Sequence, residues 1–330
     1  MSYIYSLLPV LLFLLLLLYL DSFKLIKWGL LIISALWGVS SSISTYGLNT
    51  YLLSAFHISS NDYSIFIAPV VEEGLKLLFI LVLFYTSRLG FMIDAAIYGF
   101  SAGLGFALFE NSFYAYSMEV ISSGVWIVRG LGTAIMHGGT TSVFAISLMA
   151  FSNEKARINC WQFFISFIVI VLIHSLYNSF IISPLISALV VFVFMGVLHY
   201  LVFVLSESRI RNWLDMEFDS EVSLLSSIRQ GKLLESRAGA FVKEATTKFE
   251  PLIIVDMLAY LSLYLELSIK AKSRLLLKES GLALPSMHKE RAQFSELKQL
   301  EKNIGKTGKL ALSPVLRNSK RDIWKWLQLK

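Results

Sequence analysis

The sequence has few of the residues on which soluble and secreted proteins depend. Cys160 is its one cysteine in 330 residues, so a disulfide framework is excluded. Charged residues make up 16% of the chain, whereas about 25% is usual for soluble globular domains. Hydrophobic residues make up 56%, and the mean hydropathy is +0.66. Because the apolar residues come in blocks of membrane-spanning length, the composition predicts an all-α, polytopic membrane helical bundle.

Seven apolar blocks are each long enough to cross a bilayer as a helix. They cover residues 3–20, 27–47, 64–86, 91–117, 125–150, 160–182 and 185–205. No basic residue precedes the first block and no small-x-small cleavage site follows it, so we expect a retained helix rather than a removed signal peptide. The sequence therefore predicts about seven transmembrane helices in a domain of residues 1–205.

Positive charge is concentrated in the last part of the chain and in every second loop. Residues 206–330 hold 22 of the 29 Lys and Arg residues and 15 of the 23 acidic residues, a net charge of +7. The basic residues of the shorter loops are Lys24, Lys27, Arg88, Lys155 and Arg157, and the intervening loops have none. By the positive-inside rule, we expect the N-terminus outside and residues 206–330 in the cytoplasm, as a basic helical tail.

The tail contains one long apolar stretch, residues 249–278, which is broken by Asp256 and Glu266. We expect a core or interfacial amphipathic helix there rather than an eighth span. At the end of the chain, Trp324 and Trp326 stand among Lys and Arg, a composition suited to anionic membrane lipids; a solvated helical end is the alternative. The tail is also a candidate for binding a cytoplasmic partner, and no nucleic-acid partner is expected.

Polar side chains recur at helical spacing in four consecutive spans. They are Glu72, Glu73 and Lys76, then Glu110, Asn111 and Tyr114 on a face that begins with Phe106, then Arg129, Thr133, His137 and Thr141, and finally His174 and Asn178. An unpaired charge at the bilayer centre costs at least about 2.5–3.5 kcal/mol, so this set needs partners or water. Counted from the outer span ends, Glu72, Glu110 and His174 lie at a similar depth, roughly 10–14 Å. We therefore expect one cavity in the outer half of the membrane.

Packing explains part of this pattern. Lys76 is spaced to pair with either neighbouring glutamate, and Arg129 is a candidate counter-charge for Glu110. His199 stands alone on the seventh span and is expected to be a satisfied buried histidine. The glycines expected to allow close helix approach are Gly99, Gly103, Gly138 and Gly139. Packing alone, however, gives no reason to bury three glutamates and two histidines together, so the set indicates a functional site.

Hydrolysis of a peptide bond inside a membrane is one chemistry that this set suits. It requires water, a carboxylate that takes the proton, and groups that stabilise the oxyanion. Glu72 and Glu73 are candidates for the base, and His137 and His174, with Asn178, could stabilise the oxyanion or, with a glutamate, bind Zn²⁺. No HExxH motif occurs. A non-catalytic ion or proton pathway is the alternative, because buried Glu and His chains also serve transporters.

The motifs resemble those of the PrsW family of intramembrane proteases. EEGLK, with Glu72, Glu73 and Lys76, looks like the EExxK motif of this family, and FALFENSFY, from Phe106 to Tyr114, matches FxxxENxxY. His137 and His174 fall where the two later histidines of the family stand. The resemblance covers about residues 64–182, which we take as the catalytic core. The related CAAX-protease and bacteriocin-processing superfamily uses EExxxR and FxxxH, from which this chain departs, so prenylated substrates are not expected.

The resemblance implies a multi-pass enzyme of a prokaryotic plasma membrane that cuts a single-span protein, such as an anti-sigma factor, near its outer side. The catalytic residues that it implies are Glu72, Glu73, Lys76, Glu110, Asn111, His137 and His174. The family is commonly grouped with the metallopeptidases, which favours Zn²⁺ held by His137, His174 and Glu110. The nearby cations Lys76 and Arg129 oppose a divalent ion, so direct activation of water by a carboxylate remains the alternative.

Overall fold

The computed structural model describes residues 4–316 except 57, 118–121, 153–157, 234–238, 240–243, 245–247, 285–287 and 314. Among these residues every regular element is a helix, which confirms the predicted all-α class. The chain divides into two compact units, residues 1–207 and 208–330. The predicted lipid-binding residues Trp324 and Trp326 and the loop charges Lys155 and Arg157 lie outside the described residues.

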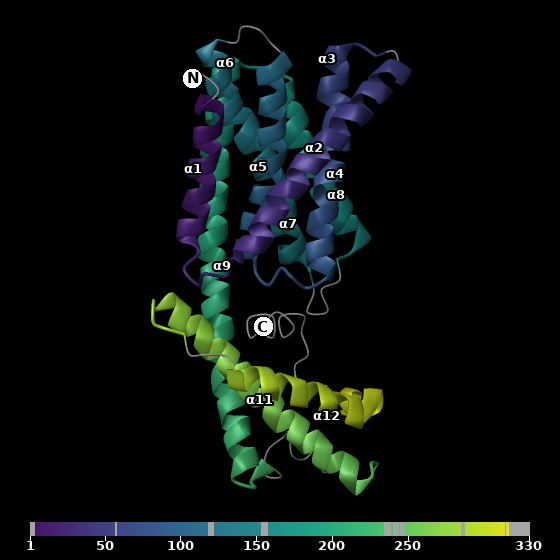
Figure 1. Ribbon diagram of the computed structural model, residues 1–330, viewed down its shortest axis with the longest axis vertical. Coiled ribbons are helices and arrows are strands. Elements are labelled where there is room, and N and C mark those ends of the chain that lie inside the picture. Colours follow the sequence, from purple (N-terminus) through teal and green to yellow (C-terminus); the bar gives the residue numbers. More distant parts are fainter. Residues whose placement is uncertain are drawn as a thin grey trace. The chain divides into compact units, whose positions relative to one another are not determined.

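The helices of the first unit coincide with the seven apolar blocks of the sequence (Figure 1). They are α1 (Ile4–Leu20), α2 (Trp28–Phe56), α3 (Ser60–Asp62), η1 (Tyr63–Ile67), α4 (Ala68–Tyr85), α5 (Met92–Ser117), α6 (Ser123–Val128), η2 (Arg129–Ala134), α7 (Ile135–Phe151), α8 (Cys160–Asn178) and the first part of α9 (Pro184–Arg229). The elements η1 and η2 are π-helical, a geometry that is rare and frequent at functional sites. They lie directly before α4 and α7, the helices that carry Glu72 and His137.

Several described helices are long and apolar enough to cross a membrane, and they make this a multi-pass membrane protein. There are six such segments: 28–56, 92–117, 123–151, 160–178, 184–212 and 251–279. The helix α1 is shorter, at 17 residues, and α4 carries three charged residues. Seven spans with the N-terminus outside therefore remain a prediction.

Helix α5 lies buried between α2 and α7, and glycines allow the three backbones to touch. A Cβ atom at Gly103 of α5 would overlap the backbone carbonyl of His137 in α7. One at Gly105 would overlap the backbone carbonyl of Ala35 in α2. The expected role of Gly103 in close helix packing is thus confirmed, and the contact holds the backbone of His137 directly against α5.

The second unit consists of the last part of α9, α11 (Pro251–Glu279) and α12 (His288–Leu312). Its hydrophobic core contains Leu225, Met257, Tyr260, Leu261, Tyr264, Leu265, Leu267, Ala271, Leu297, Ile304, Leu312 and Leu316. Within this unit the fully buried Lys272 forms an ion pair of 2.9 Å with Glu221. Most of these core residues belong to α11, so the packing favours a core helix over an eighth span, although the helix is long and apolar enough for either.

Candidate active site

The first unit contains a cavity of about 450 Å³ between the helices that carry the polar residues. The residues of the four predicted stripes that line it are the apolar Phe106 and the polar or charged Glu72, Glu110, Tyr114, Arg129, Thr133, His137, His174 and Asn178. Glu73, Lys76 and Asn111 are not part of the lining, and all three side chains are buried. The structure therefore separates the predicted site residues into cavity-facing residues and residues that lie behind them.

The two adjacent glutamates of α4 face different surroundings, because consecutive helical residues point about 100° apart. The side chain of Glu72 is 15% exposed and lines the cavity, whereas that of Glu73 is 0% exposed. Lys76, one turn later, lies with its Nζ 2.7 Å from Glu73 Oε1. Of the two partners that the sequence allows for Lys76, the structure pairs it with Glu73.

Glu73 joins three helices through one carboxylate oxygen. In addition to Lys76, its Oε1 accepts hydrogen bonds from Thr140 Oγ1 of α7 at 3.1 Å and from His174 Nδ1 of α8 at 2.8 Å. Because the carboxylate can only accept, the proton of a neutral His174 must sit on Nδ1. The lone pair of His174 is then on Nε2, which lies 3.6 Å from Glu72 Oε2.

His137 has both ring nitrogens engaged. Lys76 Nζ donates to Nδ1 at 3.1 Å, so Nε2 carries the proton and donates to Glu110 Oε2 at 3.1 Å. Glu110 Oε1 in turn lies 3.3 Å from Arg129 Nη2, which confirms the expected counter-charge. Asn111 accepts a hydrogen bond from Arg129 Nε at 2.7 Å and so anchors the guanidinium.

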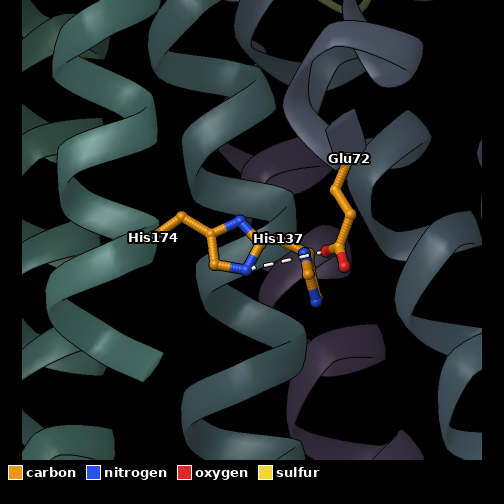
Figure 2. Close-up of side chains that lie close together, drawn as sticks. All are labelled: Glu72, His137 and His174. Carbon is orange, nitrogen blue, oxygen red and sulfur yellow. Dashed lines mark ion pairs between the residues drawn. The ribbon is translucent and has the colours of Figure 1, made fainter. Parts of the chain in front are cut away.

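Glu72, His137 and His174 form the group best placed to hold a metal ion. Each offers one ligand atom, and these atoms all lie within 4.8 Å of one another. Figure 2 shows the three side chains pointing toward one another from α4, α7 and α8. The sequence-based prediction names Glu110 as the carboxylate ligand, and it stays a prediction; in the structure Glu110 contacts Arg129 and His137.

The charges of the site fit a divalent cation. Lys76 is neutralised by Glu73 and Arg129 by Glu110. Among the described residues, Glu72 forms no ion pair with a Lys or Arg side chain, so its carboxyl group is available as a ligand beside two histidines. The opposition expected from the two cations is therefore largely removed by the other two carboxylates.

Sequence reasoning missed the contribution of α2. Asn49 Nδ2 donates to Glu72 Oε1 at 3.4 Å, and Asn49 Oδ1 accepts from Tyr63 OH at 2.9 Å. The cavity-lining residues of α2 are Ser42, Thr45, Tyr46, Asn49, Thr50 and Leu53. Their helical spacing is a signal that was available in the sequence, but α2 contains no charged residue to draw attention to it.

His199 lies outside this group, as expected. It is buried, its Nε2 lies 2.7 Å from Ser142 Oγ, and its Nδ1 lies 2.7 Å from the carbonyl oxygen of Met195. Both ring nitrogens have partners within the helix bundle, which confirms a satisfied buried histidine.

Comparison with known proteins supports the resemblance seen in the motifs. Residues 27–206, more than half of the chain, match the PrsW family of intramembrane metalloproteases. The matched region contains α2, η1, α4, α5, η2, α7 and α8, each of which contributes residues to the cavity lining. No curated protein and no solved structure matched the chain. On the family match, the chain belongs to the PrsW family of intramembrane metalloproteases and is a multi-pass membrane protease.

Proposed function

We propose that the protein hydrolyses a peptide bond of a single-span membrane protein near the extracytoplasmic face of a prokaryotic plasma membrane. An anti-sigma factor is the substrate type that we expect. The observation that carries the proposal is the convergence of Glu72, His137 and His174 from three helices in one cavity, in a chain of this family.

Glu72, His137 and His174 would hold a zinc ion. Two imidazoles and one carboxylate are a ligand set found in catalytic zinc sites, which keep one position for water. A zinc ion held there would polarise the scissile carbonyl group and make the bound water a stronger nucleophile. Glu73 acts behind the ligands, because its hydrogen bond to Nδ1 keeps the lone pair of His174 on Nε2. To act as a ligand, His137 would give up its contact with either Lys76 or Glu110.

Glu110 is the proton carrier in this proposal. Its side chain is 28% exposed, lines the cavity and contacts His137. As the water oxygen bonds to the carbonyl carbon and the C–N bond breaks, Glu110 takes a proton from the water and passes it to the leaving nitrogen. This differs from the sequence-based hypothesis that Glu72 or Glu73 is the base, because Glu73 lies behind the cavity and Glu72 is used as a ligand.

The test is cleavage by the purified chain in proteoliposomes containing candidate single-span proteins, with fragments identified by mass spectrometry and zinc by elemental analysis. We expect about one zinc per chain, lost together with activity in chelator and in His137→Ala. Glu110→Gln should keep the zinc and lose at least about 100-fold in turnover, the lower range for a general base.

Two outcomes would contradict parts of this proposal. Full activity at negligible metal content would leave a carboxylate-activated water as the mechanism. Proton flux across the vesicles without any cleavage would support the ion-pathway alternative instead.

A further inference from the structure

One hydroxyl group on the α2 wall of the cavity differs from its neighbours along the helix. Ser and Thr side chains of α2 that donate to a carbonyl three or four residues earlier are Ser34, Ser40, Ser41, Ser44, Thr50 and Ser54. This is the usual way in which a hydroxyl is satisfied within a helix. The cavity-lining hydroxyls of Ser42 and Thr45 are not in this set, and of these two the Thr45 Oγ1 is the buried atom without a hydrogen-bond partner in the described part of the chain.

The position of Thr45 makes this exception informative. The residue is 2% exposed and lines the same cavity as Glu72 and His137. A buried hydroxyl without a partner destabilises the folded protein, and valine has nearly the same shape without that cost. Arg129 also lines the cavity with a buried nitrogen that lacks a hydrogen bond, but its guanidinium is ion-paired with Glu110. Folding therefore gives no reason for a hydroxyl at position 45.

Binding of a protease substrate would explain a hydroxyl group at position 45. A peptide bond in a transmembrane helix has its carbonyl and amide groups bonded within the helix, and these groups become free when the segment unwinds to reach the site. Inside a membrane such freed groups need new hydrogen-bond partners. The α2 wall offers hydroxyl and amide side chains, whereas α5 contributes the aromatic residues Phe106, Phe109, Phe113 and Tyr114. The hydroxyl and amide groups of the α2 wall thus suit a backbone, and the aromatic residues beside Glu110 on the α5 wall suit apolar side chains.

We propose that the cavity binds its substrate as an unwound segment, and that the Thr45 hydroxyl donates a hydrogen bond to a backbone carbonyl of that segment. The inference rests on the proposed proteolytic function and adds a substrate-binding residue on α2. Thr45 lies one turn before Asn49, so the substrate backbone would run beside the residue that holds Glu72.

The first test compares Thr45→Val with Ser44→Ala and Thr45→Ser in the full-length chain. The substrate is a synthetic single-span peptide that the wild-type protein cleaves. Thr45→Val should lower kcat/KM about fivefold to tenfold, mainly through KM, as expected for one lost hydrogen bond, while Tm stays equal or rises. Ser44→Ala is the matched control, because it removes the hydroxyl next to Thr45 on the same helix, where Ser44 is exposed, donates to the carbonyl of Ser40 and does not line the cavity; its kinetics should stay near wild type. Thr45→Ser, which keeps the hydroxyl, should cleave like wild type.

The second test locates the contact on the substrate. Backbone amides of the peptide are replaced one at a time by esters, whose carbonyl groups are weaker acceptors. At one position near the cut, the ester should slow cleavage by the wild-type protein but not by Thr45→Val.

The outcomes separate the inference from the function on which it rests. Unchanged kcat/KM in Thr45→Val, or ester effects that are the same in both proteins, overturns the inference alone. A lower Tm in Thr45→Val at unchanged kcat/KM assigns the hydroxyl to folding and overturns it as well. A wild-type protein that cleaves no single-span peptide contradicts the proposed function and the inference with it.

Discussion

At the scale of single residues, the adjacent glutamates Glu72 and Glu73 have separate tasks. Glu73 is fully buried and compensates Lys76 while it orients His174. Glu72 faces the cavity without a Lys or Arg partner in the described structure. Replacing each glutamate by glutamine should therefore have different consequences for stability and for metal binding.

Glu73→Gln leaves the buried ammonium of Lys76 without its counter-charge. Breaking a buried pair from one side costs about 3–5 kcal/mol, so we expect a much lower Tm as well as lost activity. Glu72→Gln should lose zinc and activity while Tm in chelator stays near that of the metal-free wild type. Thermal unfolding in detergent measures both. The double variant Glu73→Gln/Lys76→Met should regain much of the stability but not the activity, and equal Tm values for the two single variants would contradict the assignment.

Asn49 is the residue that positions Glu72 from α2. Its amide bonds one oxygen of Glu72, and the hydroxyl of Tyr63 fixes which way the amide points. Loss of such an outer partner typically weakens metal binding or activity about 10–100-fold, so we expect this range for Asn49→Ala and a smaller loss for Tyr63→Phe. Competition with a zinc chelator measures the affinity. Unchanged zinc affinity in both variants would show that Asn49 only fills space.

At the scale of helices, the site depends on how closely α5 approaches α7. The backbone of His137 touches α5 at Gly103, where no side chain fits. The π-helical segment η2 directly precedes α7 and carries Arg129. The helix backbone therefore changes from π-helical to α-helical geometry between the site residues Arg129 and His137.

Gly103→Ala should push α7 away from α5. We expect overpacking to cost about 1–3 kcal/mol and cleavage to fall more steeply than stability, because the displaced backbone carries His137. Gly74→Ala on α4 is the control, since a Cβ there meets nothing within 4 Å although Glu73 is its neighbour. Thermal unfolding and cleavage are measured on both variants, and full activity in Gly103→Ala would disprove the dependence on this contact.

At the scale of the whole molecule, successive connections between the helices of the first unit lie at opposite ends of the helix bundle. The α1–α2 and α4–α5 connections, which contain Lys24, Lys27 and Arg88, lie at one end, and α3 and α6 lie at the opposite end (Figure 1). This arrangement agrees with basic residues in every second loop, from which the sequence predicts the orientation in the membrane.

Cysteine labelling tests that orientation. In a Cys160→Ser background, cysteines at Ser60 and Ser123 should react with an impermeant thiol reagent from outside intact cells, and cysteines at Ser152 and Ser226 should not. Ser60 and Ser123 are exposed and leave the helix-capping hydroxyls of Ser59 and Ser122 in place. The reverse pattern would place the cationic end outside and would contradict cleavage at the extracytoplasmic face.

The sequence by itself determined the protein class, the helices and the family. Blocks of apolar residues show directly which helices are long and apolar enough to lie in a membrane. The motifs around Glu72 and Glu110 are short local patterns, so they can be recognised in the sequence without a structure. The pairing of Arg129 with Glu110 and the isolation of His199 also followed from spacing and composition.

Only the tertiary structure decided which side chains meet. Periodicity places residues on one face of a helix, but it leaves open how far each helix is rotated about its axis and shifted against its neighbours. That rotation turns Glu72 to the cavity and Glu73 to Thr140 and His174 of the neighbouring helices. It also brings Glu72 close to both histidines, while Glu110 contacts His137 and Arg129. It also turns Asn49 and Thr45 of the uncharged helix α2 into the site; their helical spacing is present in the sequence, but it does not distinguish site residues from packing residues.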